Sequence, residues 1–134
     1  MKRIVFVFAM LLSANAVFAQ NAEKPAKHED VKVEQKQIIL NKYNEIVSLL
    51  DKKDFTAAKQ AYTAAEKLMN QNLEMDKKMI RKESNEDTKK KMERNLDSKT
   101  RLLEASKPFA TADLATSGKR YAVYIMEFAN VAGW

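Results

Sequence analysis

The chain has 134 residues, and its 24 Lys and Arg residues against 18 Asp and Glu residues give a formal net charge of +6. It contains no Cys, one His, two Gly and two Pro. This composition excludes disulfides, thiolate metal sites, glycine-rich phosphate loops and multi-histidine zinc sites, and it disfavours folds of many short strands. A single helical domain without a cofactor is therefore the expectation at this length.

Residues 1–19, MKRIVFVFAMLLSANAVFA, have the layout of a secretory signal peptide. Two basic residues precede nine apolar residues at positions 4–12, and small residues follow. Cleavage is expected after Ala19, with Ala16 as the alternative. An uncleaved anchor is disfavoured because a spanning helix needs roughly 20 apolar residues. The sequence thus predicts an exported protein, periplasmic or extracellular, with no spanning membrane segment after signal cleavage.

Residues 20–28 form a polar segment with Pro25 and no apolar periodicity, which predicts a flexible leader. A first helix is predicted from Glu29 to Lys52, because acidic residues occupy its first turn and apolar residues recur at helical intervals. The residues expected on its apolar face are Val31, Ile38, Ile39, Leu40, Tyr43, Ile46, Val47, Leu49 and Leu50.

A second helix is predicted to begin at Phe55, with Asp54 as its N-terminal cap. Its small and aromatic residues alternate at helical spacing, so it should pack closely on the first helix as an antiparallel αα-hairpin. The residues with this spacing are Phe55, Ala58, Ala61, Tyr62, Ala65, Leu68, Met69 and Leu73.

Part of this hairpin, residues 52–68, resembles the centre of a tetratricopeptide repeat. Lys53 stands where that motif has Gly, Asn70 stands where it has Pro, and no second copy begins about 34 residues later. The resemblance implies a helical hairpin, but a single repeat does not form the concave peptide-binding groove of that family. The residues that match the motif are Phe55, Ala58, Tyr62 and Ala65.

Residues 81–91 include eight charged side chains and no apolar one. Ser84 followed by Asp87 predicts a capping box, so one helix should end near Lys82 and a third should begin at 85. A continuous helix through Ser84 is the alternative. The third helix has a thin apolar stripe, so we expect it to pack against one partner at most or to project into solvent.

The third helix should end near Ser106, and Thr111 or Asp113 should start the last one. Residues 121–131 are almost entirely apolar and favour a helix, because a lone strand would have no partner in this chain. Gly118 is expected to mark a bend or a break.

These patterns predict an all-α fold, a small up-down bundle of about four helices in two αα-hairpins, with one helix long and highly charged. Residues 29–134 should form one helical domain. No catalytic, cofactor or metal site is recognisable, so we do not expect an enzyme. Carboxylate catalysis would need a pair in a dry pocket, whereas the candidates are expected on a solvated face. These candidates are Glu74, Asp76, Glu83 and Glu86.

Two kinds of binding surface are predicted. An apolar helical face with a charged rim should contact a protein partner or a second copy of the chain, and its candidate residues are Met75, Met79, Tyr124, Phe128 and Trp134. The candidate anion-contact residues are Lys89, Lys90, Lys91 and Arg94. Acidic residues alternate with these bases, and no aromatic residue is interleaved for base stacking, so nucleic acid is not expected.

The leading hypothesis is an exported, non-enzymatic binding or scaffold protein of the cell envelope, acting through the apolar helical face. One alternative is a periplasmic holdase-type chaperone or stress protein. Another is a helical protein that binds anionic lipid or polysaccharide weakly. Loss of residues 1–19 disfavours this last alternative, because it leaves 22 basic against 18 acidic residues, a net charge of only +4.

Overall fold

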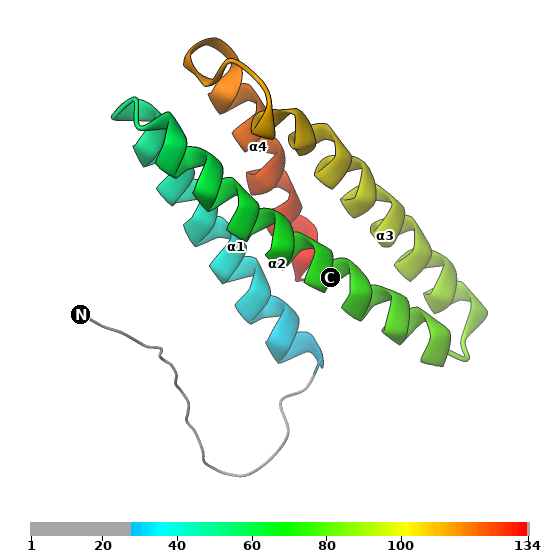
Figure 1. Ribbon diagram of the computed structural model, residues 1–134. Coiled ribbons are helices and arrows are strands. Elements are labelled where there is room, and N and C mark those ends of the chain that lie inside the picture. Colours follow the sequence, from blue (N-terminus) through cyan, green and yellow to red (C-terminus); the bar gives the residue numbers. More distant parts are fainter. Residues whose placement is uncertain (1–27, 134) are drawn as a thin grey trace, which may run out of the picture.

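A computed structural model describes residues 28–133 of the chain (Figure 1). The described part forms an up-down-up-down bundle and contains no strand. Its helices are α1 (His28–Asp51), α2 (Phe55–Lys82), α3 (Glu86–Ser106) and α4 (Leu114–Ala132), with a short 3-10 helix, η2 (Lys107–Ala110), before α4. The predicted all-α bundle is confirmed. The predicted signal peptide and all but the last residue of the predicted leader lie outside the described residues.

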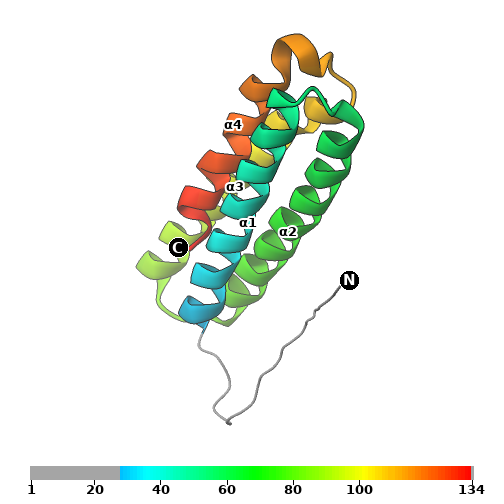
Figure 2. The same cartoon turned by 90° about the vertical axis from the view of Figure 1, so that its left-hand side faces the viewer.

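Each helix packs against the two helices beside it (Figures 1 and 2). Helices α1 and α3 both pack against α2 and α4, and they lie diagonally across the bundle with no close approach of their backbones. Of the two alternatives predicted for the third helix, packing against one partner at most is therefore wrong. Leu103 is buried, and Leu96 and Leu102 are partly buried. A narrow apolar stripe on α3 is therefore enough for this helix to pack against both α2 and α4.

Side-chain caps define where three of the helices begin. The Asp54 carboxylate accepts a hydrogen bond from the backbone N–H of Ala57 at 3.2 Å, as the sequence predicted. Helix α3 is capped by Asn85, whose side-chain oxygen accepts from Thr88 N–H at 2.9 Å. The predicted capping box of Ser84 and Asp87 is wrong, although the chain does break between α2 and α3.

The start of α4 is also capped by a side chain. Asp113 accepts from Ala115 N–H at 3.2 Å, which decides between the two predicted starts. The helix runs through Gly118 without interruption, so the predicted break at this residue is wrong. A Cβ at Gly118 would lie 2.9 Å from a methyl group of Leu50. This glycine thus allows α1 and α4 to approach closely.

The core is a closed cluster of apolar side chains between all four described helices. Tyr62 stacks on Phe109 of η2 with ring centroids 5.1 Å apart, and its hydroxyl lies 3.1 Å from Ser106 Oγ. Ile38, predicted on the apolar face, is 39% exposed and lies outside the core. The largest fully buried apolar side chains are Ile39, Ile46, Tyr62, Met69, Phe109, Ile125 and Phe128.

The turn between α1 and α2 contains a backbone conformation that suits Gly better than the residue present. Lys53 has a φ of 61°, in the left-handed region that costs an L-residue about 1–2 kcal/mol. Lys53→Gly is expected to raise the free energy of unfolding by about 0.5–1 kcal/mol, because the relief exceeds the added chain entropy. Lys52→Gly, at a position without positive φ, should lower it. Urea unfolding of both variants tests this, and equal effects would contradict it.

Candidate functional site

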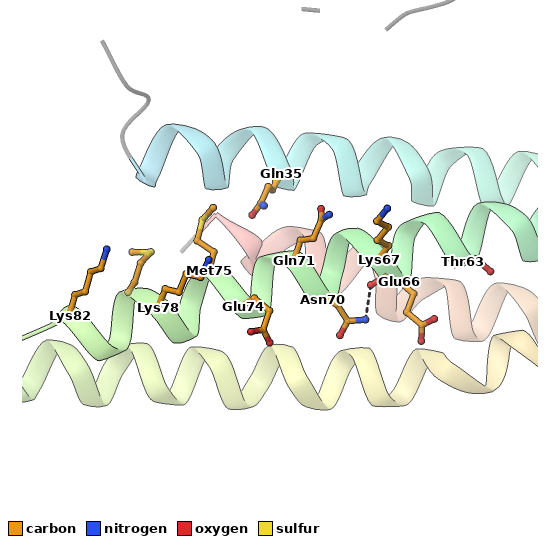
Figure 3. A pocket seen from close by; sticks show the side chains of 11 residues that line it. Gln35, Thr63, Glu66, Lys67, Asn70, Gln71, Glu74, Met75, Lys78 and Lys82 are labelled. Carbon is orange, nitrogen blue, oxygen red and sulfur yellow. Dashed lines mark hydrogen bonds between the residues drawn. The ribbon is translucent and has the colours of Figure 1, made fainter. Parts of the chain in front are cut away.

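A groove of about 870 Å³ runs along the outer face of α2. Its lining consists of Gln35 of α1 and ten α2 residues between Thr63 and Lys82. Figure 3 shows Gln35 extending from α1 toward α2 and Met75 extending from α2 toward α1. Helix α2 is the longest of the described helices, at 28 residues, so this face offers a long and straight surface.

The groove has an apolar portion bordered by charged side chains. Met75 and Met79 are half-buried, lie one helical turn apart and supply its sulfur-containing surface. Lys78 and Lys82 border the same end of the groove. Glu74 also lines it, and its carboxylate pairs with Lys77 Nζ at 3.1 Å.

A layer of buried polar side chains lies beneath this end of the groove. Asp76 of α2 is 4% exposed, Lys32 of α1 is 4% exposed and Lys99 of α3 has no exposed surface. One carboxylate oxygen of Asp76 accepts a hydrogen bond from Lys99 Nζ at 2.8 Å, and the other accepts from Lys32 Nζ. A single carboxylate therefore holds ammonium groups from two helices that lie diagonally across the bundle.

Asn72 extends this layer to the fourth helix of the bundle. Its side-chain oxygen accepts from Lys99 Nζ at 3.0 Å. Its amide nitrogen donates to Gln35 Oε1 at 2.6 Å and to the Ala132 carbonyl at 3.2 Å. Because Gln35 also lines the groove, the groove surface and the buried layer share a hydrogen-bond partner.

A second link between groove and layer is Met79. This side chain lines the groove and also a cavity of about 40 Å³ that Lys32, Asp76, Met92 and Asn95 complete. Met79 thus separates the groove from the ion pair of Lys32 and Asp76. A molecule lying on Met79 would be within one side-chain layer of buried charge.

Burial lowers the pKa of Lys99 to about 8 from its ordinary value of 10.5. Removal from water disfavours the ammonium form, and Lys32 opposes it further, whereas Asp76 favours it. An amine with this pKa suits proton transfer, but Lys99 exposes no surface to a substrate. The hydrogen bonds from Lys99 to Asp76 and Asn72 join side chains inside the bundle, so Lys99 has a structural role.

The sequence interpretation placed Asp76 on a solvated face, and this was wrong. Asp76 continues the stripe of buried α2 residues through Met69, Asn72 and Leu73, at intervals of three and four. Lys99 continues the α3 stripe toward Leu103 in the same way. Helical periodicity without regard to polarity would have identified both residues as buried.

The predicted partner-contact residues do not form one surface. Met75 and Met79 lie in the α2 groove, whereas Tyr124 is half-buried on α4. Phe128 has no exposed surface, because it lies on the core side of α4 with Ile125, and a folded bundle cannot present it to a partner. Trp134 lies outside the described residues.

The predicted anion-contact residues are also divided. Lys90 and Arg94 line a shallow hollow of about 490 Å³ on α3, together with the acidic Glu93 and Asp97. Asp97 in turn pairs with Arg101 at 2.8 Å. The other two residues, Lys89 and Lys91, do not line this hollow. Acidic neighbours therefore offset the positive charge that an anion would need.

Residues 28–133 contain neither a metal-binding cluster nor a membrane-spanning helix. This part of the chain has no group of three His, Asp or Glu side chains placed to hold a metal ion. None of its helices combines the length and apolarity needed to cross a membrane. Comparisons with known protein families, curated proteins and solved structures gave no match to this chain. The likeness to a tetratricopeptide repeat is thus without support from a family match.

Proposed function

We propose that this chain is an exported, non-enzymatic binding or scaffold protein of the cell envelope, and that its α2 groove holds a protein partner. One observation carries the proposal: Met75 and Met79 form an apolar patch on a face of α2 that the rest of the described bundle covers only in part.

The chemistry of the lining suits binding. Methionine side chains adapt their shape to a partner and are common on surfaces that accept helices. The described titratable groups with no exposed surface, such as Lys99, stabilise the bundle from inside and do not face the groove. Because the apolar core is already closed, binding at the groove does not require the bundle to open.

Site-specific crosslinking in the cells that make the protein tests this proposal. A photoreactive amino acid at Gln71, which lines the groove, is expected to give a defined protein adduct. The same amino acid at Asn41, an exposed α1 position outside the groove, should give none. Combining Met75→Gln with Met79→Gln should remove most of the Gln71 adduct while leaving the helical circular dichroism unchanged.

Several outcomes would contradict the proposal or redirect it. Equal adducts from Gln71 and Asn41, or no adduct from Gln71, would contradict it. Many unrelated adducts from Gln71, together with suppression of client aggregation at low salt, would favour the holdase alternative. Mass spectrometry of the recovered protein tests export separately, since cleavage after Ala19 leaves Gln20 as the first residue.

A further inference from the structure

The groove favours a partner that satisfies its own backbone hydrogen bonds. Every residue that lines it belongs to α1 or α2, and the backbone N–H and C=O groups of the lining are paired along these helices up to Lys78; only carbonyls of the last turn of α2 lack an intrahelical partner. An extended peptide would find no continuous row of main-chain partners along this lining. A helix needs none, and the lining from Thr63 to Lys82 is about 28 Å long, room for about five turns.

The spacing of the methionines sets the pattern that such a helix should carry. Met75 and Met79 lie on one side of α2, one turn apart. Apolar side chains spaced by three or four residues on a docked helix would meet both of them. The partner helix is therefore amphipathic, with its apolar stripe toward the methionines.

The charges around the methionines determine which residues should flank the apolar stripe of the partner helix. Lys78 and Lys82 border this end of the groove, and within residues 28–133 neither takes part in an ion pair. The acidic residue nearest in sequence on the same lining, Glu74, already pairs with Lys77. The groove thus offers two ammonium groups beside an apolar surface.

We infer that the groove accepts an amphipathic helix of a partner protein whose apolar stripe is flanked by acidic residues; this inference rests on the proposed function. A second copy of the chain fits less well. Its most acidic stretch, the start of α3 with Glu86 and Asp87, continues directly into three lysines at positions 89–91. That helix would bring like charge against Lys78 and Lys82.

Binding of three model helices tests the inference. The peptides share one apolar stripe with four-residue spacing and differ only in flanks of Glu, Gln or Lys. The protein, as recovered from the cells that produce it, is labelled with [methyl-¹³C]methionine, and its NMR signals are assigned by single Met→Leu substitutions. Met75 and Met79 are expected to shift on titration, whereas Met69, which is fully buried, serves as the internal control.

The acidic peptide should bind roughly 3- to 10-fold more tightly than the uncharged one, as expected for two exposed ion pairs, and high salt should remove this advantage. Combining Lys78→Gln with Lys82→Gln should also remove it, while Lys90→Gln on α3 should not. If the uncharged or basic peptide binds as tightly as the acidic one, the inference is overturned but the groove remains a binding site. If no peptide shifts Met75 and Met79, both proposals fail.

Discussion

Replacing Asp76 by Asn is expected to lower the free energy of unfolding by about 3–5 kcal/mol at neutral pH. The Asp76 carboxylate accepts hydrogen bonds from Lys32 and Lys99, and all three side chains are almost completely buried. An amide of the same shape carries no charge, so the two ammonium groups would repel each other in a site shielded from water. The loss should appear as a lower midpoint in urea unfolding.

Glu74→Gln provides the matched control for this substitution. Glu74 lies two residues before Asp76 on α2, but its side chain is 65% exposed and its ion pair with Lys77 is on the surface. Its loss is expected to change the free energy of unfolding by less than about 0.5 kcal/mol. If Asp76→Asn were no more destabilising than Glu74→Gln, burial of the Lys32 and Lys99 ammonium groups would not depend on the Asp76 carboxylate.

The second large effect concerns Lys99 and alkaline pH. Between pH 8 and 10.5 the unfolded chain holds a proton on Lys99 that the folded chain has already released. Rising pH therefore stabilises the folded state across this window, and it has no effect through Lys99 below or above it. The contribution is about 3 kcal/mol, from the size of the pKa shift.

Comparison of the wild-type chain with Lys99→Met isolates this contribution. The variant keeps the length of the side chain but has no titratable group, so effects of lysines outside this buried layer cancel in the difference. The stability of the wild type relative to Lys99→Met is expected to rise from pH 7.5 to pH 10, measured by urea unfolding at each pH. A constant difference would show that the amine titrates near its ordinary pKa.

The sequence predicted the helices well because their signals are local. Apolar spacing and the cap at Asp54 depend on neighbouring residues only, and the ends of α2 and α3 fall where predicted. The helix break predicted at Gly118 was wrong because that prediction also used neighbouring residues only. In sequence this glycine interrupts a helical pattern, whereas in the bundle it makes room for Leu50 of another helix. Its role depends on a contact between residues distant in sequence.

The candidate site was only partly predictable. Met75 and Met79 were identified because their spacing places them on one face. The buried layer was missed because charged residues were assumed to face water, whereas Lys32 and Lys99 reach one carboxylate from opposite corners of the bundle. A partner for buried charge comes from the tertiary arrangement, and no window of one helix contains it.

The sharing of one carboxylate by two lysines constrains the order in which this layer could be lost during evolution. Loss of Lys99 first leaves Lys32 and Asp76 as a pair, which is a tolerable intermediate. Loss of Asp76 first leaves two buried ammonium groups that repel each other. After Lys99 has gone, removing either remaining partner alone strands a charge in the interior. The last pair can then be replaced only by two substitutions together, so descendants of this chain should keep it even where Lys99 varies.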